Sequence, residues 1–160
     1  MSMDPILRLL RCQGRATEAG LAEELSLTTE EVAAKVAAWE ADGTILGYQT
    51  VVDSSKTGAG GSAFIEVKLT PERGGGFDRL AGRIAKFDQV SSCYPASGRY
   101  DLLLVVEGDD LLDVARFVSE KLSSMEGVIS TATHFRLKAY KENGFLFHQD
   151  DDPARLPVSP

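Results

Sequence analysis

The run Tyr100–Val106 constrains the fold more than any other part of the sequence, because it is apolar on both of its sides. Successive side chains of a β-strand point to opposite faces of a sheet. One face of this run carries Tyr100, Leu102, Leu104 and Val106, and the other carries Leu103 and Val105. With Val90–Pro95 before it and Ser-Gly turn residues at Ala96–Arg99, the run predicts a β-hairpin. Its second strand needs a cover on both faces.

The bulk composition narrows the classes of protein. A length of 160 residues with 43% hydrophobic residues fits one ordinary domain or two small ones. No apolar run is long enough to span a bilayer, and the N-terminus lacks a signal-peptide layout. Cys12 and Cys93 lie too far apart in sequence for a disulfide framework or a zinc site, so we expect a cytoplasmic protein without a structural metal or cofactor.

The net charge of −7 argues against a general nucleic-acid binder, since phosphate contacts need Lys and Arg. A sequence-specific module needs only a local basic patch, so DNA binding stays open.

Residues 4–42 carry three short helical patterns. The first has Ile6, Leu9 and Leu10 on one face and ends at Gln13-Gly14. Thr17 is placed to cap a second helix, which buries Leu21 and Leu25 and is followed by a tight turn at Ser26-Leu27. Thr28 opens a third helix, with Glu31 completing a capping box and Val32, Val36 and Trp39 on the buried stripe. This order matches a helix-turn-helix, and the alternative is a three-helix bundle that acts only as a structural cap.

The residues after the helices predict a connection. Thr44–Asp53 reads as a β-type run, and residues 54–61 have the Ser, Gly and Thr composition of a linker. We expect residues 1–52 to form a helix-turn-helix domain with a β-linker, 53–61 a linker, 62–139 a second domain, and 140–160 a partly flexible extension.

The second domain reads as βαββαβ. After a strand over residues 62–69 and a glycine loop, residues 77–85 form a helix, the hairpin follows, residues 111–122 form a second helix, and 128–138 a last strand. Right-handed crossovers put both helices on one face of a ferredoxin-like sheet, with the first and third strands in its middle. The other face then exposes Phe64, Val128, Ala132 and one side of the central strand. A second copy of the chain is the simplest cover, so we expect a dimer at least.

The tail combines a turn signal with an acidic end. Asn143-Gly144 favours a tight turn before Phe145-Leu146-Phe147. Residues 149–160 are acidic and contain prolines, and we expect them to be solvated and flexible.

These elements, in this order, resemble the Lrp/AsnC, or feast/famine, family of bacterial and archaeal regulators. The motifs are Leu27-Thr28, Trp39–Ile45 leading into Gly47-Tyr48, Ser97–Asp101, and Gly127-Val128 leading into Ser130–Phe135. The resemblance covers residues 3–138. It implies an α+β fold with an N-terminal winged-type helix-turn-helix and a C-terminal RAM-type ferredoxin-like domain. It also implies a sequence-specific regulator that binds double-stranded DNA, forms homodimers, tetramers or octamers, and binds an amino-acid effector.

The resemblance assigns DNA contacts to the third helix, Thr28–Ala41, and its surroundings. The candidate residues are Thr28, Thr29, Glu30, Lys35 and Arg15. No arginine stands in this helix, and residues 1–52 carry a net charge of −4. Two interpretations stay open: the carboxylates serve the helix dipole and capping box, or the module has kept the fold but binds DNA poorly.

The resemblance assigns the effector site to the hairpin turn and the last strand. The candidates are Ser97, Gly98, Arg99, Tyr100, Asp101, Thr131, Thr133 and His134. Gly98 would let a ligand approach the backbone, and Asp101 could bind an ammonium group. The alternative is structural, with Gly98 needed only by the turn, Asp101 a turn cap, and the threonines ordinary strand composition.

Three function classes therefore remain. They are a DNA-binding regulator, a DNA-free oligomer that binds a small molecule, and an enzyme. No P-loop or GxGxxG pattern is present, His134 and His148 lack zinc-ligand spacing, and no catalytic constellation is recognisable. We therefore expect no enzyme activity.

Overall fold

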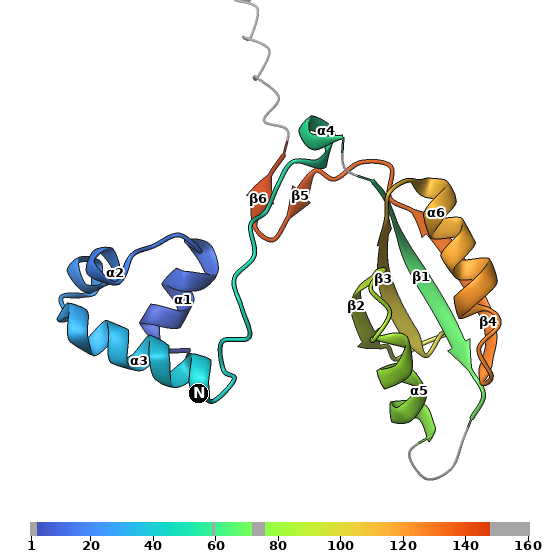
Figure 1. Cartoon of the computed structure of the whole chain (residues 1–160), viewed down its shortest axis with the longest axis horizontal. Coiled ribbons are helices and arrows are strands. Elements are labelled where there is room, and N and C mark those ends of the chain that lie inside the picture. Colours follow the sequence, from blue (N-terminus) through green and yellow to red (C-terminus); the bar gives the residue numbers. More distant parts are fainter. Residues whose placement is uncertain (1–2, 59, 72–75, 148–160) are drawn as a thin grey trace, which may run out of the picture. The chain divides into compact units, whose positions relative to one another are not determined.

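The structure is a computed structural model that describes residues 3–58, 60–71 and 76–147. The chain separates into two compact units. One comprises Met1–Val52 together with the segment after Tyr140, and the other comprises Asp53–Tyr140. Figure 1 shows the helices at the start of the chain and, in the second unit, a sheet with its own helices.

Three capped helices make up the first unit, as predicted. They are α1 (Pro5–Cys12), α2 (Glu18–Leu25) and α3 (Thr29–Ala41). Each helix begins after an N-cap residue whose short polar side chain accepts a hydrogen bond from a backbone N–H of the first turn. These N-cap residues are Asp4, Thr17 and Thr28. The stripes meet in a small core of Ile6, Leu21, Ala22, Val32 and Val36, with Trp39 packed beside it.

The turn between α2 and α3 sets the helix-turn-helix geometry. Ser26 adopts the left-handed region at φ 56°, and the Leu27 N–H donates to the carbonyl oxygen of Ala22 at 2.9 Å. This closes α2 abruptly, so that α3 starts only a few residues later. The predicted tight turn at Ser26-Leu27 is confirmed.

The predicted strand over Thr44–Asp53 is wrong: the structure has no strand among these residues. A β-strand is defined by hydrogen bonds to a neighbouring strand, and this run has no such neighbour in the described part of its own chain. Several of its apolar side chains are exposed, with Leu46 94% accessible. A short helix, α4 (Ser54–Thr57), follows inside the predicted linker.

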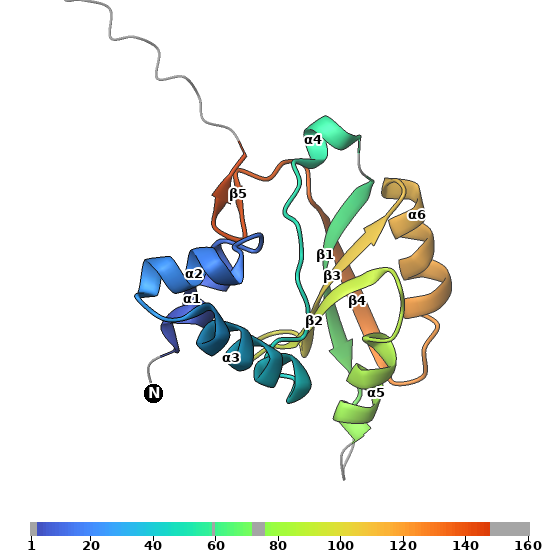
Figure 2. The same ribbon diagram turned by 60° about the vertical axis from the view of Figure 1, so that its left-hand side comes forward.

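The second unit is the predicted βαββαβ arrangement. Its elements are β1 (Gly61–Leu69), α5 (Gly76–Ile84), β2 (Val90–Pro95), β3 (Leu102–Gly108), α6 (Leu111–Arg116) continued by η1 (Phe117–Leu122), and β4 (Val128–Phe135). The antiparallel sheet has the order β2-β3-β1-β4, so the first and third strands are central, as expected. Both helices lie on the same face of the sheet (Figures 1 and 2).

The helix-covered face holds the core. Alternate residues of β1 and β3 are fully buried there, namely Ala63, Ile65, Val67, Leu102, Leu104 and Val106. Their neighbours in sequence point to the opposite face, where Leu103 and Val105 are half-buried and Phe64 is 40% exposed. Val128 was predicted on that open face, but it packs against the core, because a bulge between Lys68 and Leu69 shifts its register.

One further boundary and the form of the second helix differ from the predictions. The strand begins at Leu102 rather than Tyr100, so Tyr100 and Asp101 belong to the turn. The second helix widens into a π-helical segment, with the Ser123 N–H donating to the carbonyl oxygen of Val118 at 2.8 Å. This widening brings Phe117, Val118 and Leu122 onto the core together.

Asn143 and Gly144 form the predicted turn, with φ values of 48° and 91°. The turn joins two short strands, β5 (Lys141–Glu142) and β6 (Phe145–Leu146). Asn and Gly adopt the left-handed backbone region more readily than other residues, which is why this dipeptide is a hairpin signal. The acidic stretch 149–160 lies outside the described residues.

Candidate DNA-binding and effector sites

The N-terminus of α3 is fixed by its capping box. The Thr28 hydroxyl accepts from the Glu31 N–H at 3.2 Å, and the Glu31 carboxylate accepts from the Thr28 N–H at 2.9 Å. The bond from the Thr28 N–H, followed by a second one in which the Thr28 hydroxyl donates to the same carboxylate at 3.1 Å, lowers the pKa of Glu31. Glu31 is thus used locally to hold the helix start, while Thr29 and Glu30 are exposed beside it.

The two basic candidates of this unit, Lys35 and Arg15, differ in their surroundings. The Lys35 ammonium pairs with the carboxylate of Asp4, the N-cap of α1, at 2.9 Å. This pair lowers the pKa of Asp4, chiefly through its hydrogen bond from Lys35. Arg15 is exposed in the connection between α1 and α2. Of the two predicted basic contacts, Lys35 must therefore give up an ion pair to reach a phosphate.

In the second unit, Asp101 ties the hairpin turn to the neighbouring strand. Its carboxylate accepts from the Leu69 N–H at 2.8 Å, and its own N–H donates to the carbonyl oxygen of Val67 at 2.9 Å. Its carbonyl accepts from the Ala96 N–H at 2.9 Å. The Leu69 bond satisfies a backbone donor at the bulge of β1, so Asp101 has a structural role whether or not it meets a ligand.

Arg99 and His134 meet on the open face of the sheet at Glu66. One oxygen of this carboxylate accepts from the Arg99 guanidinium at 2.9 Å and lies 3.3 Å from His134 Nε2. The Glu66 side chain is 16% exposed. The hydrogen bond from Arg99 is the main cause that lowers the pKa of Glu66, and His134 contributes.

The Glu66 cluster predicts a pH dependence of stability. Its folded pKa lies below the ordinary value of 4.5, so its contribution is fully present above that value and is lost as pH falls through the folded pKa. We expect Glu66→Gln to flatten the loss of unfolding free energy on acidification, measured by urea unfolding over a pH series. The exposed Glu126→Gln is the control. An unchanged acid limb in Glu66→Gln would contradict the assignment.

The predicted effector residues do not converge on one point. The register of β1 and β4 pairs Phe64 with His134 on the open face, but pairs Val67 with Thr131 and Ile65 with Thr133 on the helix-covered face. The Thr131 hydroxyl lies 3.3 Å from that of Ser123, just after η1. The structure thus brings Arg99 and His134 together and separates both threonines from them. Ser97, Gly98 and Tyr100 remain in the turn, where Gly98 has φ 148°.

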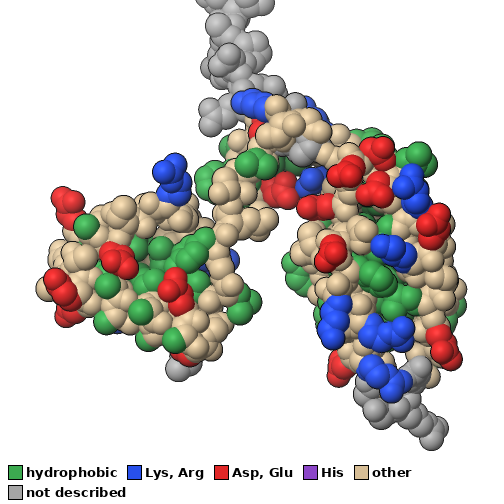
Figure 3. Space-filling view, in the orientation of Figure 1, with side chains coloured by type: hydrophobic (Ala, Val, Ile, Leu, Met, Phe, Trp, Pro, Cys, Tyr) green, Lys and Arg blue, Asp and Glu red, His purple; other side chains and the backbone are tan. Residues whose placement is uncertain are grey.

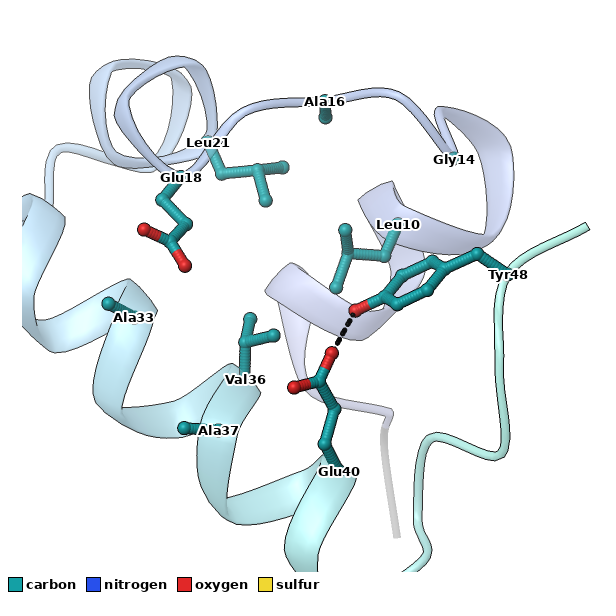
Figure 4. Close-up of a pocket in the computed structure, with 10 residues that line it drawn as sticks. All are labelled: Leu10, Gly14, Ala16, Glu18, Leu21, Ala33, Val36, Ala37, Glu40 and Tyr48. Atoms are coloured by element: carbon teal, nitrogen blue, oxygen red, sulfur yellow. Dashed lines mark hydrogen bonds between the residues drawn. The ribbon is translucent and has the colours of Figure 1, made fainter.

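Sequence reasoning missed Glu66, although it stands on the open face of an alternating strand. An acidic residue among apolar ones on such a face signals a specific polar partner. It also missed a pocket in the first unit, which Glu18, Glu40 and Tyr48 line together with apolar side chains (Figure 4).

No group of three or more His, Cys, Asp or Glu suited to a metal ion occurs among the described residues. Within those residues, every helix is too short or too polar to cross a bilayer.

Comparisons with known proteins agree on one family. The Lrp/AsnC ligand binding domain matches residues 62–146. The uncharacterized HTH-type transcriptional regulator YugG of Bacillus subtilis is 43% identical over 97% of this chain and 95% of its own length. The proline dehydrogenase transcriptional activator of Rhizobium radiobacter is 30% identical over 87% of this chain and 89% of its own.

Solved structures support the same conclusion. A transcriptional regulator of Neisseria meningitidis, solved in complex with L-methionine, is 26% identical with a TM-score of 0.70, covering 88% of this chain and 94% of its own. AsnC of Escherichia coli, at 20% identity and a TM-score of 0.68 over 89% of this chain and 97% of its own, shares the fold. The chain belongs to the Lrp/AsnC family of transcriptional regulators.

Proposed function

We propose that this Lrp/AsnC regulator binds double-stranded DNA through the exposed start of α3 and the nearby Arg15. The observation that carries the proposal is the short left-handed turn at Ser26, which presents α3 directly after α2. In a helix-turn-helix, side chains at the start of the second helix reach the base edges of the major groove. Here Thr29 and Glu30 occupy that position, and Glu can accept from a cytosine amino group.

Self-association completes the proposal. The open sheet face carries Leu103 and Val105 on the central strand β3, and a second copy of the chain would cover it. A homodimer would present two α3 helices to DNA, and tetramers or octamers would add further sites. Multivalency of this kind strengthens weak half-site binding, which matters for a unit with a net charge of −4 over residues 1–52.

DNA binding is tested by fluorescence anisotropy with the DNA upstream of the protein's own gene. We expect affinity to fall as salt rises, and to fall at least about tenfold in Arg15→Glu, because phosphate contacts release counterions. Arg83→Glu, which reverses the charge of an exposed arginine on α5, is the matched control. Equal affinities of Arg15→Glu and the parent protein would remove Arg15 from the interface, and no binding at low salt would contradict the proposal.

The Lys35–Asp4 ion pair and the acidic first unit favour a second candidate. In it, the assembly binds a small molecule without engaging DNA. Failure to bind DNA, combined with ligand-dependent stabilisation, would select this candidate.

We further propose that the effector is an amino acid, bound near the Ser97–Asp101 turn. The L-methionine complex of the Neisseria regulator supports this class of ligand. Gly98 leaves its surroundings open, since a Cβ placed there would meet no atom within 4 Å. Arg99, the next residue, and His134 supply polar groups on the open face, where both contact Glu66.

Asp101→Ala is expected to lower the free energy of unfolding by about 1–3 kcal/mol without any ligand, because it leaves the Leu69 N–H without its acceptor. Asp101→Asn keeps an acceptor oxygen and is expected to lose less. Both are measured by urea unfolding. The rise in melting temperature with each amino acid is then compared within each variant, so that a ligand role is separated from the structural one. Equal stability of Asp101→Ala and the parent would contradict the structural role.

A further inference from the structure

A pocket of about 270 Å³ opens in the three-helix unit, and none of its lining residues is assigned above to DNA or effector binding, although two of them, Gly14 and Ala16, flank Arg15. Its walls come from α1, the start of α2, one side of α3 and the segment after α3 (Figure 4). On the face of this unit seen in Figure 3, hydrophobic side chains gather in a patch with acidic side chains among them. All the lining residues belong to the first unit.

Small side chains explain why the helices leave this space. The apolar lining includes Leu10, Leu21 and Val36, of which the last two are buried in the core of the unit. On α3, beside Val36, the lining consists of alanines, Ala33 and Ala37, which lie one helical turn apart. An alanine methyl cannot fill the gap that a leucine would fill at such a crossing, so an apolar hollow remains.

Two carboxylates line this hollow. Glu40 Oε1 accepts from the Tyr48 hydroxyl at 2.9 Å. Glu18, from the start of α2, points its carboxylate into the same space (Figure 4). The pKa of Tyr48 is raised first by its hydrogen bond to Glu40, then by burial, and also by the charges of Glu40 and Glu18.

The electrostatics of the pocket are one-sided. Its lining contains Glu18 and Glu40 but no Lys or Arg. Anionic groups beside an apolar wall complement a ligand with a cationic head and a hydrocarbon chain. They repel a carboxylate, so a free amino acid, which carries one, fits the hairpin turn better than this pocket.

We propose that this pocket binds a small primary alkylamine or diamine, with its ammonium group between Glu18, Glu40 and the Tyr48 hydroxyl and its chain against Leu10, Leu21 and Val36. An ammonium group has three donors, which matches these three acceptors. The volume equals that of roughly nine water molecules at about 30 Å³ each, which limits the ligand to a short chain. The site is distinct from the proposed amino-acid site at the hairpin turn, whereas the proposed DNA contact Arg15 stands between two of its lining residues.

The test is an NMR titration of the full-length protein with n-butylamine at a pH where it is protonated. We expect saturable shifts of backbone amides in α1, α2, the second half of α3 and around Tyr48. 1-Butanol and butyrate have the same chain without the cation. We expect 1-butanol to bind at least tenfold more weakly, and butyrate not at all.

Variants separate recognition from general stability. Glu18→Gln and Glu40→Gln keep the shape and remove one charge each, so we expect each to weaken butylamine binding at least fivefold. Glu23→Gln, elsewhere on α2, is the matched control and should bind as the parent does. Ala37→Leu fills the hollow and should abolish binding, whereas Ala38→Leu, outside the lining, should not.

Each other outcome overturns the proposal. Equal binding of butylamine and 1-butanol would mean an apolar cavity without cation recognition. Unchanged binding in both Gln variants would place the amine elsewhere. Pocket resonances that shift as the protein concentration rises, together with weaker amine binding at high protein concentration, would mean that a second copy fills the pocket. No saturable shift would mean no site.

Discussion

Replacing Leu104 by alanine is expected to lower the free energy of unfolding by about 2–5 kcal/mol. Leu104 is fully buried in the middle of β3, a central strand, between β1 and β2 and beneath the helices. Truncation removes burial energy and leaves a cavity that a sheet cannot easily close. Since a domain of this kind has only about 5–15 kcal/mol of stability, the loss is a large share. Urea unfolding followed by circular dichroism measures it.

Leu103→Ala is the matched control for Leu104→Ala, because it removes the same atoms one position away. Leu103 points to the open face and is half-buried within the chain. We expect a loss on the order of 1 kcal/mol at protein concentrations low enough to favour a single copy. The loss should grow with protein concentration if a second copy covers this face. Equal losses at both positions would contradict the assignment of the two faces.

Replacing Val105 by lysine is expected to convert the proposed homodimer to monomers. Val105 lies opposite Phe64 in the register and points to the open face, at the centre of the proposed self-interface. A two-fold interface would bury this ammonium group twice, each time without a partner, at a cost of several kcal/mol per site. We expect the dissociation constant to rise about a thousandfold or more. Analytical ultracentrifugation over a concentration series measures it.

Leu112→Lys supplies the matched control for Val105→Lys. Leu112 is a large exposed side chain on α6, with 67% of its surface accessible, and it points away from the open face. The same charge placed there should leave the assembly unchanged. A parent protein that sediments as a folded monomer at micromolar concentration would contradict the proposed self-association. Dissociation caused equally by both variants would move the interface away from the open face.

Local patterns in the sequence were sufficient wherever a structure depends on neighbours in the chain. The capping box of Thr28 and Glu31, the tight turn at Ser26-Leu27 and the turn at Asn143-Gly144 all formed as predicted. So did the alternation of β1 and the strand order, because crossover handedness leaves few arrangements of βαββαβ. In these cases the energy that decides the structure comes from residues a few positions apart.

Sequence patterns failed where the deciding partner lies far along the chain or outside it. Thr44–Asp53 has the composition of a strand but no strand beside it in this chain. Val128 was assigned to the wrong face because the bulge at Lys68 and Leu69 is invisible in an alternation pattern. Thr131 and Thr133 were predicted to share one site with Arg99 and His134. The register of β1 and β4 instead places the two threonines on the opposite face of the sheet from His134.

The sequence by itself determined that a central strand, apolar on both sides, runs through a four-stranded sheet with helices on one face. It did so because side-chain alternation and apolar content are local properties that hydrophobic burial must satisfy. Only the tertiary structure decided that Asp101 holds the bulge of β1, that Glu66 gathers Arg99 and His134, and that Glu18 and Glu40 share a pocket. These groups meet across tens of residues, through strand register and helix packing, which no short stretch of sequence encodes.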